Sequence, residues 1–573
     1  MGGSDLDENA GSVLNDNQHY YLTDSTYEAF SENPKIEDFG ATGSGLQTSD
    51  NNRFLRQWFE VSSAASSFNS SSRAVAKESG KKWFPHKKGG PFRKWYGNNE
   101  FVLNWHNDGA ELYEFAANLY GSPTRIIKNT DRYFTSGITW SHTTSSKFSA
   151  RVLESNAIFN VEAPSLFDVA PAPFLCFLSS CVGDHLISIS NPTLHFVSSS
   201  VGILPFASEK IEPRSASLNT LFNKAIGLSR ADWDAYETSW DFTTLPLLSP
   251  DHRGETLENS YATLRAYWQS MTDEMQRLEE ENNRIFIDAY GLQEELTPEV
   301  SLEEITLTCN PAYRYGVKND VEANETRLRA DTMAEFLHYA VGCMFGRYSL
   351  DAPGLILANQ GETLEDYLAR IPEQSFMPDA DNVIPVLDGD WFADDIVGRA
   401  RDFIRITFGE AKFRENLAFV EAALGKDLRK WFTKDFYDYH VRRYKKRPIY
   451  WMFASPKGSF AALIYMHRYR PDTVSVVLNQ YLRDYIGKLE NERARLEKLA
   501  DDPTATPGQR TKALKDVGAV IKQIEELTAW ERDVVYPMAQ AKIAIDLDDG
   551  VKQNYPLFEG ALKPIKGLEA ADD

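Results

Sequence analysis

The sequence is poor in cysteine and has no long apolar run. The cysteines include no Cys-x-x-Cys pair and no neighbouring histidine cluster, so they predict neither a zinc site nor a disulfide framework. The longest apolar stretch, residues 174–190, is interrupted by Asp184 and His185 and predicts no transmembrane helix, hence no membrane partner. The four cysteines are Cys176, Cys181, Cys309 and Cys343.

A basic N-terminal segment followed by an apolar one is also missing. Residues 1–12 are acidic and polar, which predicts no signal peptide and a cytoplasmic location. The net charge of −22 excludes a uniformly basic coat for nucleic acid, although an acidic protein can still carry a local basic face.

Signatures of common enzyme sites are missing as well. The sequence has no G-x-S-x-G, P-loop, H-E-x-x-H or paired-carboxylate motif. A glycine-rich segment at 38–45 has neither an apolar strand before it nor a helix after it, and therefore predicts a loop between elements. We expect no cofactor-binding residue and no metal site in this chain.

One short stretch, "TLTCNPAYRYG" at 306–316, needs a separate decision. Its Asn-Pro-Ala-Tyr sequence comes within one residue of the Asn-Pro-Pro-Tyr loop with which adenine-specific DNA methyltransferases hold a flipped base. Residues 304–309 suit a strand leading into this turn, but Ala312 replaces the second proline. The interval back to the glycine-rich segment is also too long for a doubly wound domain. We therefore interpret Asn310, Pro311 and Tyr313 as a decoy in a structural proline turn and predict no catalytic residue.

The order of apolar patterns predicts a multidomain α+β fold, in which a β-rich domain is followed by a mostly helical region. A serine-rich run at 62–80 predicts a mobile surface loop. Strands are expected at 52–62, 100–105, 137–143, 157–161 and 201–206. The expected divisions are a flexible tail with one short helix (1–35), a β-rich domain (36–210), a connecting helix region (211–300), a helical domain (301–450) and a helical hairpin with a C-terminal tail (451–573).

Several helices follow from the spacing of apolar residues. Residues 253–292 predict a long amphipathic helix that ends at Gly291. Further helices are expected within 331–348 and 391–409. The segments 473–500 and 508–535 flank a short proline-containing turn and predict an antiparallel helical hairpin.

Two windows reverse the acidic balance and interleave cations with aromatic residues, a mixture that suits phosphate contact and base stacking. They lie at 77–95 and 426–470. The residues expected to contact DNA are Lys82, Lys87, Lys88, Arg93 and Lys94 in the first window, and Arg442, Arg443, Lys445, Lys446, Arg447 and Lys457 in the second.

Several long segments resemble one known family, the PglX adenine-specific DNA methyltransferases of BREX phage-defence systems. Ser49 and His195 depart from the family's usual residues. The similar segments are "GLQTSDNNRFLRQWFEV" (45–61), "KWFPHKKGGPFRKWYGNNEFVLNW" (82–105), "GITWSHTTSSKFSARV" (137–152), "NPTLHFVSSSVGILPF" (191–206), "NRIFIDAYGL" (283–292), "NPAYRYG" (310–316), "GCMFGRYSLDAPGL" (342–355) and "RPIYWMFASPKGSFAALIYMHRYRPDTV" (447–474).

The resemblance implies that the chain corresponds to the C-terminal half of such an enzyme. Its first domain is then a target-recognition domain, its DNA partner is double-stranded, and the methyl-transfer domain with S-adenosylmethionine comes from another domain or subunit, alongside other BREX proteins. Two alternatives stay open at this stage. One is an acidic, non-enzymatic scaffold, and the other is a complete methyltransferase that uses residues 310–313.

Overall fold

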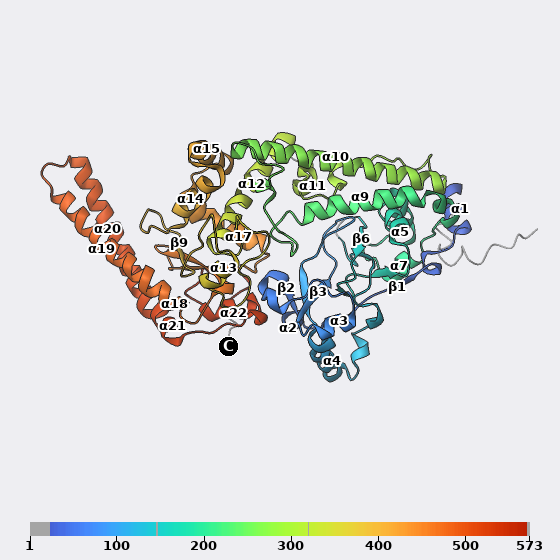
Figure 1. The fold of residues 1–573 in the computed structure, drawn as a ribbon, viewed down its shortest axis with the longest axis horizontal. Helices are drawn as coiled ribbons and strands as arrows, with labels where there is room; N and C mark the ends of the chain where they lie inside the picture. The colour runs from blue at the N-terminus through green and yellow to red at the C-terminus, as the bar shows by residue number, and fades with distance from the viewer. Residues whose placement is uncertain (1–22, 145–146, 319, 570–573) are drawn as a thin grey trace, which may run out of the picture. The chain divides into compact units, whose positions relative to one another are not determined.

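The computed structural model describes residues 23–144, 147–318 and 320–569, and Figure 1 traces them along the chain. The chain forms two compact units and crosses between them more than once. Unit 1 comprises Met1–Trp58, Ala65–Trp240 and Leu264–Glu325. Unit 2 comprises Phe59–Ala64, Asp241–Thr263 and Thr326–Asp573. Small sheets and many helices make up these units, which confirms the predicted multidomain α+β class.

Unit 1 contains two four-stranded sheets of short strands. The first is antiparallel throughout, and Ile138 lies opposite both Leu166 and Val152. In the second, one pair of neighbours, β3 and β7, runs parallel. In spatial order the first sheet is β1 (Ala41–Gly43), β8 (Ser165–Phe167), β5 (Gly137–Trp140) and β6 (Ala150–Leu153). The second is β2 (Leu55–Gln57), β4 (Phe101–Asn104), β3 (Trp83–Lys87) and β7 (Ile158–Phe159).

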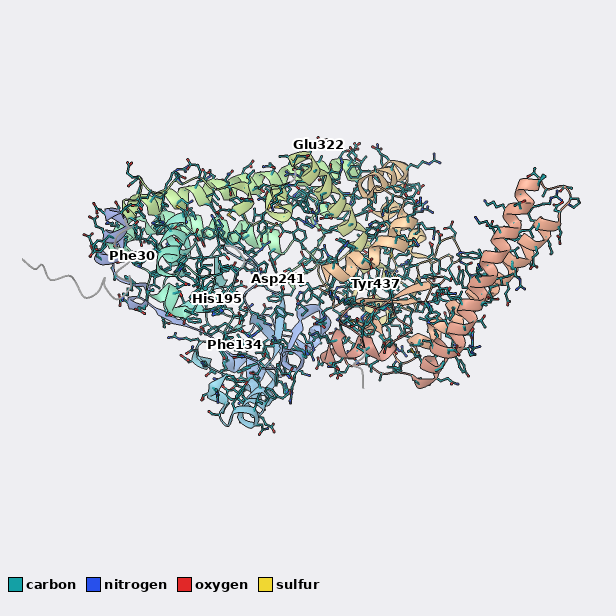
Figure 2. The ribbon with its side chains drawn as sticks, turned by 180° about the vertical axis from the view of Figure 1, so that it is seen from behind. Phe30, Phe134, His195, Asp241, Glu322 and Tyr437 are labelled. Atoms are coloured by element: carbon teal, nitrogen blue, oxygen red, sulfur yellow. The ribbon has the colours of Figure 1, made fainter. Side chains whose placement is uncertain are left out.

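A large apolar core in unit 1 joins the second sheet to helix α4 (His106–Tyr120). Phe84 and Leu103 contribute from the strands, and Leu112 contributes from the helix. Phe134 lies in the same cluster and is labelled in Figure 2. Burial of such aromatic and aliphatic side chains is the main force that holds these short strands together.

Long helices form the other part of unit 1. The predicted helix at 253–292 is confirmed as α10 (Leu257–Tyr290), and Gly291 follows it with a φ of 72°. Its apolar stripe is buried, as the spacing requires. Helices α5 (Pro171–Leu178), α6 (Cys181–Ser190) and α9 (Ser215–Trp233) belong to the same unit. The expected short N-terminal helix is α1 (Asp24–Glu32).

Three local predictions are wrong. Residues 201–206 are not a strand, because helix α7 (Ser198–Gly202) and a turn occupy them. Residues 304–309 form no strand, since a 3₁₀ turn (Leu302–Glu304) leads into irregular backbone. The serine-rich run is not a plain loop: it contains α3 (Arg73–Glu78), and Ser70 is buried. Tertiary packing overrides local composition at all three places.

Unit 2 is built around a three-stranded antiparallel sheet in the order β10-β11-β9. The helices predicted within 331–348 and 391–409 are confirmed. They contact each other through Phe336 and Phe403, whose ring centroids lie 5.5 Å apart. The strands are β10 (Tyr450–Ala454), β11 (Ala461–Tyr465) and β9 (Ile384–Pro385). The helices are α12 (Val321–Met344), α14 (Ile396–Phe408), α15 (Phe413–Leu424), α16 (Leu428–Trp431) and α17 (Tyr437–Arg443).

The predicted helical hairpin is confirmed in unit 2 as α19 (Arg483–Asp501) and α20 (Pro507–Trp530), which lie side by side in Figure 1. Thr506 and Gln509 form a capping box at the start of α20, with Pro507 in the first turn. Both are sequence signals typical of a helix start.

Within the described ranges, no single helix combines the length and apolarity needed to cross a bilayer, while α5 and α6, bent by 69° at their junction, pass that test as a pair. None of the four cysteines forms a disulfide, and all but Cys181 are buried. Burial raises the pKa of Cys181 to about 11, so its thiol stays protonated at neutral pH.

Candidate nucleic-acid interface

Two cations of the first basic window, Arg93 and Lys94, are buried inside unit 1. Arg93 is 4% exposed, and its Nη1 lies 3.3 Å from the Asp232 carboxylate of α9. The same carboxylate accepts the backbone N–H groups of Thr308 and Cys309 at 2.7 and 2.8 Å. Asp232 therefore ties the window to the segment after α10, and Arg93 serves as an internal ion-pair partner.

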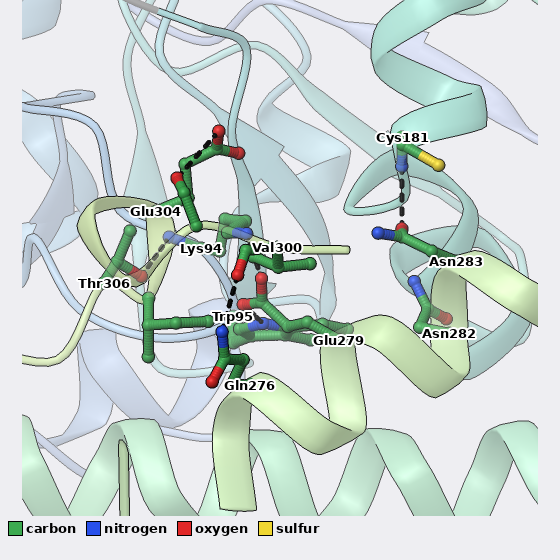
Figure 3. A network of polar contacts seen from close by, with 12 residues as sticks. Lys94, Trp95, Cys181, Gln276, Glu279, Asn282, Asn283, Val300, Glu304 and Thr306 are labelled. Atoms are coloured by element: carbon green, nitrogen blue, oxygen red, sulfur yellow. Dashed lines mark hydrogen bonds and ion pairs between the residues drawn. The ribbon is translucent and has the colours of Figure 1, made fainter. Parts of the chain in front are cut away.

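Lys94 is the second inward cation, and Figure 3 shows its surroundings. Its ammonium pairs with Glu279 of α10, which also accepts the indole N–H of Trp95 at 2.8 Å. The backbone N–H of Lys94 donates to Thr306 Oγ1 at 3.0 Å. Burial raises the pKa of Glu279, and the adjacent Lys94 opposes that rise. Both charges are thus satisfied inside the unit.

Lys87 is also buried, and its ammonium donates to the side-chain oxygen of Asn99. The structure therefore corrects the sequence-based grouping of the first window. Lys87, Arg93 and Lys94 do not present their charges to solvent, because each has an internal partner. A phosphate could reach them only if these contacts opened.

The other lysines of the first window are less buried. Lys77 is exposed, and Lys81, Lys82 and Lys88 are half-buried. The ammonium of Lys82 lies 5.3 Å from the ring of Trp83, and that of Lys88 lies 5.4 Å from the ring of Phe101. Each ammonium therefore lies within cation–π distance of an aromatic ring.

In the second window, two of the predicted contact residues are held by carboxylates of unit 2. Arg443 Nη1 lies 3.4 Å from Glu335 of α12, and both side chains are nearly buried. Arg447 Nε lies 3.8 Å from Glu60, which also accepts the backbone N–H of Val551 at 2.9 Å. These two arginines hold parts of unit 2 together.

Three neighbouring cations of the second window are exposed: Arg442, Lys445 and Lys446, which we call the basic turn. The turn follows α17, and the backbone N–H of Lys446 donates to the Val441 carbonyl at 2.8 Å. Lys445 and Lys446 have φ values of 50° and 59°, in the left-handed region that residues with a Cβ rarely adopt. Such strained backbone conformations are a frequent feature of functional sites. Lys457, in the β10–β11 turn, is exposed as well.

The Asn-Pro-Ala-Tyr stretch forms the start of a short helix, α11 (Pro311–Tyr315), in unit 1. Asn310 is 1% exposed, and its side chain caps this helix by accepting the Ala312 N–H at 3.1 Å. Its amide nitrogen donates to the carbonyls of Leu302 and Ile305 at 2.7 and 2.9 Å. Tyr313 donates its hydroxyl hydrogen to the Phe92 carbonyl at 2.6 Å. The polar groups that a flipped adenine would need are engaged within the protein.

The glycine-rich segment at 38–45 also has a local explanation. It contains β1, and a Cβ on Gly40 would lie 2.4 Å from the Phe167 carbonyl oxygen. A Cβ on Gly45 would lie 1.8 Å from the Phe159 carbonyl oxygen. Glycine is needed here for close backbone packing. Among the residues that the structure describes, no group of three or more His, Cys, Asp or Glu could hold a metal ion.

Sequence reasoning missed the acidic partners, Asp232 and Glu279. Each acid continues the buried stripe of its helix: Glu279 lies four residues after Met275, and Asp232 lies three after Ser229. A carboxylate on a buried helix face signals a buried partner. That signal was present in the sequence.

Comparison with known proteins shows two relatives of this chain. No family model matches the chain. It is 33% identical over 536 residues to "Adenine-specific methyltransferase BrxX" of Escherichia coli O9:H4 (strain HS), covering 90% of this chain and 42% of that protein. It is also 33% identical over 552 residues to "Adenine-specific methyltransferase PglX" of Lacticaseibacillus casei (strain Zhang), covering 93% of this chain and 43% of that protein. These homologues support a relationship to that methyltransferase family, and the chain spans less than half the length of the two relatives.

Proposed function

We propose that this chain is the DNA-recognition portion of an adenine-specific (N6) DNA methyltransferase of a BREX phage-defence system. The observation that carries the proposal is the similarity to two adenine-specific methyltransferases over at least 90% of the chain. Residues 36–210 act as the target-recognition domain, which reads base edges of double-stranded DNA through the grooves. The remaining residues help to hold the DNA.

The basic turn supplies the main phosphate contacts of unit 2 in this proposal. Arg442, Lys445 and Lys446 combine exposure, like charge and a constrained backbone. Each phosphate that they neutralise releases counterions, which makes binding sensitive to salt. In unit 1 the corresponding contacts come from Lys82 and Lys88, whose side chains are half-buried. Phosphate contacts of this kind fix the position of a protein on DNA, while base contacts provide specificity.

Methyl transfer and S-adenosylmethionine binding belong, in this proposal, to another domain or subunit of the enzyme. The buried, fully engaged side chain of Asn310 supports this assignment. So does the tight packing of the glycines at 38–45. The partners of the chain are then double-stranded DNA, the methyl-transfer part and other proteins of the same defence system.

A methylation assay tests this division of roles. The purified chain is incubated with duplex DNA and labelled S-adenosylmethionine, with DNA binding followed in parallel by anisotropy. We expect binding without methyl transfer, and transfer once the remaining part of a relative is added. Methyl transfer by the chain alone, abolished by Asn310→Ala in protein shown to be folded, would contradict the proposal.

A further inference from the structure

Unit 2 contains an open groove with a volume of about 990 Å³ that the DNA contacts above do not use. Its floor is one face of the small sheet, where Met452 and Ala454 of β10 and Ala461 of β11 line the cavity. Ala454 lies directly opposite Ala461 in the strand register. Because both side chains are small, the face stays open at a place where larger residues would fill it.

One wall of the groove is aromatic. Trp391 and Tyr485 both line it, with ring centroids 5.3 Å apart and planes at 80° to each other. The Lys488 ammonium donates to the Trp391 carbonyl at 2.8 Å and steadies its backbone. A half-buried indole beside an apolar floor suits a flat ring.

The rim provides charges of both signs. Lys434 and Lys457 are exposed, and neither forms a salt bridge within the described part of the chain, whereas Lys563 pairs with Asp438 at 3.0 Å. Asp388 and Glu559 line the same groove. Two available ammonium groups suit a small anion, and two carboxylates can accept hydrogen bonds from hydroxyl or amino groups of the same ligand. A long polyanion such as duplex DNA would meet repulsion from the carboxylates.

The backbone that carries the two rim lysines is ordered without any ligand. The Lys457 N–H donates to Glu526 at 2.7 Å, and the Gly458 N–H donates to the Ser455 carbonyl at 2.9 Å. Lys434 lies in a π-helical turn, Phe432–Phe436, between α16 and α17. Such turns are uncommon and often occur at functional sites. The backbone beneath both lysines is therefore preorganised, which lowers part of the entropic cost of binding.

We propose that this groove binds a nucleoside phosphate, either a free nucleotide or the terminal nucleotide of a DNA strand. The base lies against Trp391, the phosphate is held by Lys434 and Lys457, and sugar hydroxyls or base amino groups donate to Asp388 and Glu559. Both sources present the same chemistry to the groove. The inference does not depend on the proposed role of the basic turn.

Isothermal titration of the whole chain tests the groove with four probes: AMP, adenosine, inorganic phosphate and a 5′-phosphorylated tetranucleotide. We expect saturable binding of AMP that is weakened about tenfold or more in Lys434→Ala/Lys457→Ala, because two charge-assisted contacts are lost. Ala461→Leu, which fills the floor of the groove, is also expected to weaken AMP binding. The matched control is Lys430→Ala/Lys498→Ala, which removes two exposed lysines outside the groove and leaves AMP binding unchanged.

The outcomes separate the two sources. AMP binding at least as tight as the tetranucleotide indicates a free nucleotide, whereas tighter, 5′-phosphate-dependent tetranucleotide binding indicates a strand end. The inference is overturned if no phosphate probe saturates below about 5 mM, or if the lysine double variant, folded by circular dichroism, matches its control. Equal affinity for AMP and for either adenosine or phosphate alone also overturns it. Arg442→Ala leaves AMP binding unchanged, which distinguishes this site from the basic turn.

Discussion

At the scale of single residues, similar basic sequences serve two different purposes. Arg93 and Lys94 point into unit 1 and pair with Asp232 and Glu279. Arg442 is exposed on unit 2. The sequence predicts charge and aromatic content correctly in both windows, but it does not reveal which cations are buried. That depends on carboxylates far along the chain, each on the buried face of another helix.

The buried pair Lys94 and Glu279 gives the first prediction. We expect Lys94→Met to lower the free energy of unfolding by about 3 kcal/mol, because it leaves the Glu279 carboxylate buried without its cation. Lys94→Met/Glu279→Leu should cost much less than the sum of the single changes. Urea denaturation measures both. A variant of unchanged stability that binds DNA more weakly would instead support the original DNA-contact role of Lys94.

Asn310 gives a second prediction at this scale. Asn310→Ala removes a helix cap and the buried side-chain amide that donates to the Leu302 and Ile305 carbonyls, so we expect a loss of about 2 kcal/mol in the free energy of unfolding. Asn310→Asp keeps the capping oxygen and serves as the matched control for the cap alone. Thermal and urea denaturation report the change, and DNA affinity of the folded variant stays as in the wild type. A large effect on DNA affinity without a loss of stability is the contrary result.

At the scale of elements, a buried histidine pair joins two helices to the sheet of unit 2. His338 Nε2 of α12 lies 2.8 Å from His440 Nδ1 of α17. His440 Nε2 accepts the backbone N–H of Tyr450, the first residue of β10, at 3.0 Å. An accepting Nε2 requires the His440 proton to be on Nδ1, so His338 Nε2 is the acceptor between the rings. The neutral form of His440 therefore links α12, α17 and β10 through these two hydrogen bonds.

This arrangement predicts a pH dependence of stability. Burial lowers the pKa of His440 well below its ordinary value of 6.5, and burial with the nearby Arg347 lowers that of His467 to about 3. The unfolded chain takes up these protons below about pH 6.5, whereas the native unit does not. The free energy of unfolding therefore falls as pH decreases from about 6.5 towards 3, by up to about 1.4 kcal/mol per pH unit for each histidine.

Urea denaturation at a series of pH values between about 7 and 4 measures this slope. His467→Gln removes one titrating group and is expected to reduce the slope by up to about 1.4 kcal/mol per pH unit. A slope that the substitution leaves unchanged would show that His467 titrates normally in the native unit.

Elements with strong local signals were predictable from the sequence. The helices α10, α12, α14, α19 and α20 follow from apolar spacing and capping residues. The prediction of a strand at 201–206 was wrong, although the composition there is typical of a strand. The segment forms a helix and a turn, whose shape is set by packing against the rest of unit 1. The strands of both sheets are also short, so their pairing order depends on contacts distant in sequence.

At the scale of the whole molecule, the acidic balance makes binding to DNA depend on local basic surfaces. A net charge of −22 repels a polyanion at long range, so a few exposed cations must provide most of the favourable electrostatics. The basic turn is such a surface. The groove of unit 2, which two carboxylates line, is suited to a smaller ligand.

The salt dependence of duplex DNA affinity tests the central claim most directly. Wild-type chain is compared with Arg442→Glu/Lys445→Glu/Lys446→Glu, and with Lys512→Glu/Lys515→Glu/Lys522→Glu on the hairpin, which changes the net charge equally. We predict that only the basic-turn variant binds more weakly and loses roughly 0.9 in the slope of log affinity against log salt for each phosphate contact removed. Unchanged affinity and slope in that variant, or equal losses in both, would contradict the claim.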